Sequence, residues 1–120
     1  MPRRALLLIN PGARRGDAAG EEPRARLEAS GLELRVVTAF EPGAAGEIIG
    51  RERAGIDRVI VAGGDGTLNA VLQGLVGTDL PLGILPLGTA NNLARTLRIP
   101  TSLPEAAEVA AGDARRAVDL

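Results

Sequence analysis

One stretch of the sequence decides the interpretation of the rest: Val59-Ile60-Val61-Ala62-Gly63-Gly64-Asp65-Gly66-Thr67-Leu68-Asn69. Its four leading apolar residues predict a buried strand, and the three glycines that follow surround a single carboxylate. Apolar residues then recur at helical spacing, which predicts an amphipathic helix with Leu68, Val71, Leu72, Leu75 and Val76 on its inner face. A carboxylate in a glycine-rich turn between a strand and a helix is suited to meet a phosphate through a metal ion.

The segments around this stretch predict alternating strands and helices. We expect strands at Ala5–Ile9, Leu32–Thr38, Asp57–Ala62 and Leu82–Leu85, and a last one that begins within 114–120. The alternating pattern of Leu32–Thr38 places that strand near a sheet edge. Further helices are expected at about 17–30, from Pro42 to Gly55, from Thr89 to residue 99 and from Leu103 to Gly112.

This alternation, with short connections, predicts a single α/β domain whose mostly parallel sheet is flanked by helices on both faces. In such sheets, ligands bind at the carboxyl ends of the strands. The loops richest in Gly, Pro, Asn and Thr lie at 10–16, 63–67 and 86–92, and each follows a strand. We therefore expect these loops to share one edge of the sheet and to form one site.

The composition excludes several classes of chemistry. The 120 residues include no cysteine, no histidine and no lysine, so disulfides, histidine–metal sites, Schiff bases and a Walker-type lysine are all excluded. A net charge of −1 argues against a nucleic-acid-binding protein. No apolar run approaches the roughly 18 residues of a membrane span. These features predict a soluble protein of a reducing, intracellular compartment.

The residues of the loops allow a ligand-binding role and a purely structural one. Asp65 would repel a bare phosphate, so a binding role requires an intervening Mg²⁺; the alternative is a turn formed by Asp65 and a helix capped by Thr67. Arg14 and Arg15 either reach phosphates or only solvate their loop. Thr89 either joins the site or caps the next helix. The glycine spacing is not Gly-x-Gly-x-x-Gly, which argues against a dehydrogenase.

Two motifs together resemble one family. The run from Ala62 to Asn69 and the run Pro86-Leu87-Gly88-Thr89-Ala90-Asn91-Asn92-Leu93-Ala94-Arg95 resemble the diacylglycerol kinase catalytic domain, and most closely that of bacterial lipid kinases related to sphingosine and ceramide kinases. Asn10-Pro11 and Thr38 also match that family. The resemblance covers essentially residues 1–120. It implies a fold similar to the nucleotide-binding domain of NAD kinases and phosphofructokinases.

The resemblance also implies a site. It implies that ATP and Mg²⁺ bind across the three loops, that Asp65 acts near the metal-bound phosphates, and that Asp119 joins a charged network around the metal with Arg15. The residues implied to contact ATP are Asn10, Pro11, Gly12, Ala13, Arg14, Arg15, Thr38, Gly63, Gly64, Asp65, Gly66, Thr67, Leu68, Asn69, Ala70 and Thr89.

The acceptor implied by the family is a lipid alcohol. In the family, a carboxyl-terminal β-rich domain supplies the lipid pocket and the general base, and we expect this chain to end where that domain begins. The resemblance implies a cytoplasmic protein that binds no nucleic acid, and it is compatible with a homodimer and with peripheral contact at the inner face of the membrane.

The sequence departs from the family at two positions. Ala70 stands where the family has Glu, and Asn92 stands where it often has Asp, so negative charge near the metal is reduced. Two alternatives therefore stay open. One is an NAD kinase, which shares Gly-Gly-Asp-Gly-Thr, and the other is a non-catalytic nucleotide-sensing module.

Overall fold

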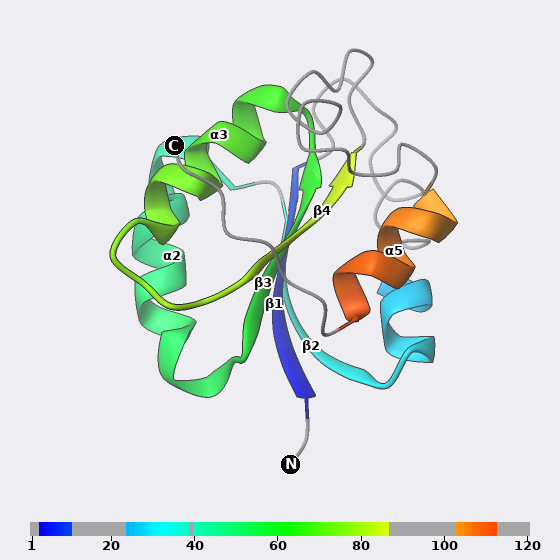
Figure 1. The fold of residues 1–120 in the computed structure, drawn as a ribbon. Coiled ribbons are helices and arrows are strands. Elements are labelled where there is room, and N and C mark those ends of the chain that lie inside the picture. Colours follow the sequence, from blue (N-terminus) through cyan, green and yellow to red (C-terminus); the bar gives the residue numbers. More distant parts are fainter. Residues whose placement is uncertain (1–2, 11–23, 39, 87–102, 113–120) are drawn as a thin grey trace.

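The computed structural model describes residues 3–10, 24–38, 40–86 and 103–112. Within them a sheet of four parallel strands has the order β2-β1-β3-β4 (Figure 1). The strands are β1 (Arg3–Asn10), β2 (Leu32–Thr38), β3 (Arg58–Gly63) and β4 (Leu82–Pro86). The helices are α2 (Ala45–Glu52), α3 (Asp65–Leu75) and α5 (Leu103–Ala111), with one more at 24–29 and 3-10 turns at Pro42–Ala44 and Arg53–Gly55.

Helices cover both faces of the sheet, as the sequence predicts. α2 and α3 lie on one face, and α5 and the helix at 24–29 lie on the other (Figure 1). Strand β1 supplies both cores: Leu6 and Leu8 pack on the α2–α3 side, whereas Leu7 and Ile9 pack on the α5 side. Because both faces of β1 are covered, its sequence is a continuous apolar run instead of an alternating one.

The predicted edge position of β2 is confirmed within the described sheet. Its exposed residues, such as Glu33 and Arg35, alternate with more buried ones. The four predicted strands all form, and β3 ends at Gly63, one residue later than expected.

Helix ends agree with the sequence in two cases and differ in two. Helix α5 ends at Ala111, directly before Gly112, as predicted. Gly31 has φ +94°, and the N–H groups of Ser30 and Gly31 donate to the carbonyls of Leu27 and Glu28, so a glycine ends that helix as predicted. Helix α2 ends at Glu52, before the 3-10 turn that contains Gly55. Val76 was expected on the inner face of α3, but the helix ends at Leu75, and Val76 lies in the turn that follows and is 69% exposed.

Two close contacts hold helices against their neighbours. A Cβ built on Gly74 of α3 would lie 2.8 Å from Cα of Gly46 in α2, and one built on Gly83 of β4 would lie 2.7 Å from Cβ of Ala110 in α5. Each glycine therefore permits a close approach that a larger residue would prevent. The first contact lets α3 pack closely on α2.

A buried arginine anchors the far end of α5. Arg58, at the start of β3, is 7% exposed, and its Nη1 donates to the carbonyls of Ala110, Ala111 and Gly112 at 3.3, 2.9 and 3.0 Å. Its Nε donates to Oδ1 of Asp57 at 2.8 Å. A cation at this position complements the partial negative charge of the helix terminus.

Several predicted elements lie outside the described residues. They are the helix from Thr89, the strand within 114–120 and the first turns of the helix expected at 17–30. Within the described ranges, no helix has the length and apolar character that a membrane span requires.

Candidate functional site

The carboxyl ends of the strands form one edge, as the sequence predicts. In the parallel register, Asn10 stands opposite Gly63, Gly63 stands opposite Pro86, and Thr38 stands opposite Ile9. The chain segments that follow β1, β3 and β4 therefore start at the same level of the sheet. The first loop beyond Asn10 and the third beyond Pro86 lie outside the described residues.

The glycine loop joins β3 to α3 at this edge. Gly64 is the N-cap residue of α3 and has extended backbone, with φ −91° and ψ −173°. The first helical hydrogen bond runs from the N–H of Leu68 to the carbonyl of Gly64 at 3.0 Å. The N-cap residue is a glycine and has no side chain with which to cap the helix, and the first N–H groups of a helix are suited to an anionic ligand.

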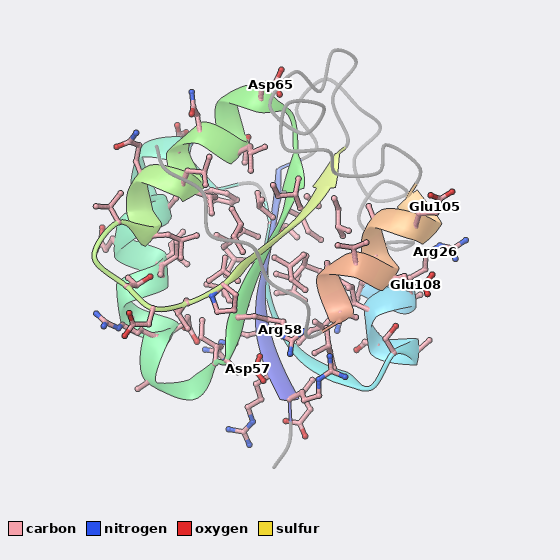
Figure 2. The ribbon with its side chains drawn as sticks, in the orientation of Figure 1. Arg26, Asp57, Arg58, Asp65, Glu105 and Glu108 are labelled. Atoms are coloured by element: carbon pink, nitrogen blue, oxygen red, sulfur yellow. The ribbon has the colours of Figure 1, made fainter. Side chains whose placement is uncertain are left out.

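The structural alternative for this loop is not the arrangement observed. Thr67 was considered as an N-cap, but it lies within the first turn of α3 and is 9% exposed. Its side chain belongs to the buried side of the helix. Asp65 is the first helical residue, and it is partly exposed at the tip of α3 (Figure 2). An acidic residue in the first turn is favourable because of the helix dipole, by about 0.3–1 kcal/mol.

The side chains of the predicted binding run divide between core and surface. Leu68 is 3% exposed, and Ala70 packs partly against the α2–α3 core. Any ligand contact by Leu68 would therefore use its backbone. Gly66 and Asn69 are exposed, and Thr38 is exposed at the end of β2.

Gly66 has no packing requirement for glycine. A Cβ built on it meets no atom within 4 Å, and its φ lies outside the left-handed region that favours glycine. In Gly74 and Gly83, by contrast, the absence of a side chain is needed for the fold. A glycine that the fold does not need, on an exposed helix start, is compatible with close approach of a ligand to the backbone.

The described residues contain one carboxylate in this loop and no cluster of three or more His, Cys, Asp or Glu side chains that could hold a metal. Mg²⁺ in nucleotide sites is commonly held by one or two carboxylates together with substrate phosphates and water. Asp65 fits that arrangement, in which the nucleotide completes the metal site. It does not fit a metal held by protein side chains alone.

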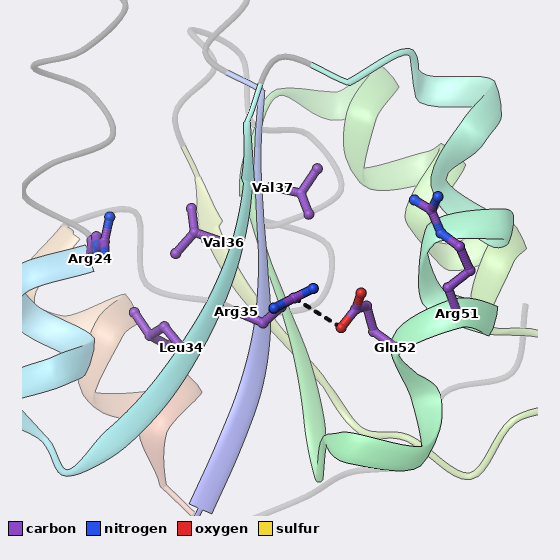
Figure 3. Close-up of a pocket in the computed structure, with 7 residues that line it drawn as sticks. All are labelled: Arg24, Leu34, Arg35, Val36, Val37, Arg51 and Glu52. Carbon is purple, nitrogen blue, oxygen red and sulfur yellow. Dashed lines mark ion pairs between the residues drawn. The ribbon is translucent and has the colours of Figure 1, made fainter.

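Seven predicted site residues lie outside the described ranges, and their predicted roles stay predictions. They are Pro11, Gly12, Ala13, Arg14, Arg15, Thr89 and Asp119. Asn92, at which the sequence departs from the family, also lies outside. The described cavity, of about 690 Å³, is lined by other residues, at the edge of β2 (Figure 3). Phe40 is a residue whose place the sequence did not indicate; it follows β2 and is 8% exposed in the α2–α3 core.

Comparison with known proteins agrees with the motifs. The family model described as the diacylglycerol kinase catalytic domain matches residues 4–120. The chain belongs to the diacylglycerol kinase catalytic domain family. The resemblance seen in the two sequence motifs, and the α/β fold that it implies, are thus confirmed.

Relatives of this kinase domain are longer proteins. The chain is 41% identical over 116 residues to "Probable lipid kinase YegS" of Escherichia coli O17:K52:H18, which covers 92% of this chain and 39% of that protein. It is 40% identical over 103 residues to "Diacylglycerol kinase" of Mycobacterium tuberculosis, with 83% of this chain and 33% of that protein covered. The chain thus spans about two fifths or less of these relatives' lengths.

A solved structure shares the fold of this kinase domain. The crystal structure of a diacylglycerol kinase from Bacillus anthracis matches with a TM-score of 0.72 and 32% sequence identity, over 89% of this chain and 42% of that one.

Proposed function

We propose that this chain is the nucleotide-binding part of a lipid kinase that transfers the γ-phosphoryl group of Mg·ATP to a lipid hydroxyl such as that of diacylglycerol. The observation that carries the proposal is the shared edge, at which Asn10, Gly63 and Pro86 stand in register and α3 begins with Asp65. Membership of the diacylglycerol kinase family supports the reaction, and this edge is where α/β sheets bind ligands.

The residues at the edge suit the donor side of the reaction. Phosphoryl transfer depends mainly on positioning and on stabilisation of charge. The first N–H groups of α3 would bind phosphate oxygens, and Gly66 leaves its backbone open to approach. Asp65 would hold Mg²⁺, which when bound neutralises phosphate charge. Asn10 and Thr38 would contact the nucleotide from the neighbouring strand ends, with Arg14, Arg15 and Thr89 from the predicted loops, and Asp119 would join the charged network around the metal.

The acceptor side belongs to the remainder of a longer protein in this proposal. Because the chain spans 39% of the length of the YegS relative, we expect the lipid pocket and the general base outside these residues. The 120-residue chain should then bind Mg·ATP and transfer little phosphate to diacylglycerol. Transfer from labelled ATP is measured with diacylglycerol and with NAD as acceptors. Rapid lipid phosphorylation by the chain alone would contradict this division, and transfer to NAD would favour the NAD kinase alternative.

The test of the donor site is Asp65→Asn. It removes the charge that would hold the metal but keeps the size of the side chain. We expect the affinity for ATP in the presence of Mg²⁺ to fall about ten-fold or more, which corresponds to roughly 1.4 kcal/mol. Isothermal titration calorimetry with and without Mg²⁺ measures the change, and the difference should vanish without the metal.

Asp79→Asn is the matched control. Asp79 is exposed in the segment that follows α3, at the opposite end of that helix from Asp65. The same loss of charge at Asp79 should leave Mg·ATP affinity unchanged. Equal affinities for the Asp65 variant, the Asp79 variant and the unsubstituted chain would remove Asp65 from the proposed site.

A further inference from the structure

The outer edge of β2 has the features of a strand-pairing surface. In the described sheet, β2 pairs with β1 on one side, and no described strand pairs with its other side. A cavity of about 690 Å³ follows this edge, with Arg24 on one flank and Arg51 and Glu52 of α2 on the other (Figure 3). An open strand edge offers backbone N–H and C=O groups to another strand.

The two faces of β2 carry different chemistry. Leu34 and Val36 point toward the helix at 24–29, whereas Arg35 and Val37 point toward α2 (Figure 3). Leu34 and Val36 are partly buried against the α5-side core. On the other face the side chains of Glu33 and Arg35 are 61% and 69% exposed. One face of the edge is therefore apolar, and the other presents one negative and one positive charge.

We propose that β2 pairs antiparallel with β2 of a second copy of this chain, about a two-fold axis at Leu34. In this register Leu32 stands opposite Val36 of the partner subunit, and Leu34 stands opposite its own copy. Glu33 stands opposite Arg35 of the partner subunit, and Arg35 opposite Glu33 of the partner subunit. Every pair between residues 32 and 36 is then apolar with apolar or acidic with basic, and each opposite-charge pair adds about 0.2–1 kcal/mol. Val37, beyond these pairs, stands opposite Gly31 of the partner subunit.

Other registers of the same strand are less complementary. The two-fold axis of such a pair is perpendicular to the sheet, so each side chain and its copy lie on the same face. Opposite residues must also lie on the same face, and the axis must therefore pass at the level of one residue, on which the pairing is centred. Centring on Glu33 places two glutamates opposite each other, and centring on Arg35 places two arginines opposite each other. Centring on Val36 places Arg35 opposite an apolar residue. The register at Leu34 is the one that satisfies both faces.

Existing ion pairs would extend across this interface. Nε of Arg4 lies 3.0 Å from Oε2 of Glu33, and Nε of Arg35 lies 3.1 Å from Oε1 of Glu52. In the register centred on Leu34, the Arg4–Glu33 ion pair of one copy would lie beside the ion pair formed by Arg35 and Glu52 of the partner subunit. The four side chains would then form a row of alternating charge. Charge complementarity thus selects a second copy as the occupant of the edge. This inference is independent of the proposed phosphoryl transfer.

The first test combines solution mass with charge reversal. Light scattering at about 0.1 mM protein should give twice the 12.3 kDa of one chain. Glu33→Arg or Arg35→Glu alone turns two attractive pairs into repulsive ones, and each should raise the dissociation constant of the dimer about ten-fold or more. An equimolar mixture of the two variants should dimerise again, because the two positive side chains of one then face the two negative side chains of the other.

The mixture separates intermolecular from intramolecular effects. Each reversal also breaks an ion pair within the chain, to Arg4 or to Glu52, and mixing cannot restore those. If the unsubstituted protein has the mass of a single chain, the proposal is overturned. The edge would then pair with a strand other than β2 of a second copy. A dimer that is indifferent to both reversals, or a mixture that stays monomeric, would overturn it as well.

The second test locates the axis. The chain has no cysteine, so a single introduced thiol reports one contact. Leu34→Cys should give a disulfide-linked dimer on mild oxidation, because opposite Cβ atoms in an antiparallel pair lie about 4.5–5.5 Å apart. Val76→Cys is the control, since Val76 is 69% exposed and lies beyond α3. Cross-linking at position 76 in preference to position 34 would overturn the proposal.

Discussion

The two ends of the sheet use their charged residues in opposite ways. At the amino end of β3, Arg58 is buried, and four hydrogen bonds of 2.8 to 3.3 Å tie it to Asp57 and to the end of α5. At the carboxyl end, Asp65 is partly exposed at the start of α3 (Figure 2), next to a glycine that the packing does not require. The first end is built for stability, whereas the second keeps groups available to a ligand.

The largest expected effect is at the amino end. Arg58→Ala should lower the free energy of unfolding by about 3 kcal/mol, because it leaves buried carbonyls of α5 without their donor and removes a cation from a helix terminus. Urea denaturation measures the change. Arg58→Lys keeps the charge but not the forked donors, so it should recover part of the loss. A loss below about 0.5 kcal/mol for the alanine variant would mean that the anchor contributes little.

The contact between α2 and α3 comes next in size. Gly74→Ala introduces a Cβ that must displace the backbone of Gly46, and we expect a loss of about 2 kcal/mol in stability. Gly50→Ala is the matched control on α2, because a Cβ there meets nothing within 4 Å. The control should gain up to about 1 kcal/mol from helix propensity. Equal free energies of unfolding for Gly74→Ala and Gly50→Ala would show that α2 and α3 can move apart without a loss of stability.

The smallest effect on stability is expected at the carboxyl end. Gly66→Ala should change the free energy of unfolding by less than about 1 kcal/mol, since its Cβ enters open space. Its affinity for Mg·ATP should nevertheless fall, because the added methyl group faces the proposed phosphate position. Denaturation and calorimetry on the same variant give both values. A large loss of stability with unchanged affinity for Mg·ATP would mean that Gly66 serves the packing and not ligand binding. That result would contradict the contrast drawn between the two ends.

Much of the fold was predictable because burial of both sheet faces leaves a direct trace in the sequence. The continuous apolar runs of β1 and β3 and the alternation in β2 identified their strands and the edge position of β2. The alignment of Asn10 with Gly63 and Pro86 followed from parallel topology alone. The exposure of Val76 was not predictable, since the helical spacing continues one residue past the point where α3 ends.

The candidate site was predictable as a place but not in the detail of its side chains. The helical spacing correctly placed Leu68 on the core side of α3, yet the motif did not indicate that Thr67 is also buried. Thr67 and Leu68 belong to the core side of α3, and Gly66 and Asn69 belong to the surface. That division depends on how α3 packs on the sheet and on α2, which it approaches closely at Gly46 and Gly74.

The sequence by itself determined the family, the alternation of strands and helices, and the edge at which the glycine loop emerges. These depend on local periodicity and on motifs of contiguous residues. The tertiary structure alone decided the buried role of Arg58 and the need for glycine at 74 and 83. Each of these joins residues that are far apart in the chain, and such pairs leave no local pattern from which their contact can be inferred.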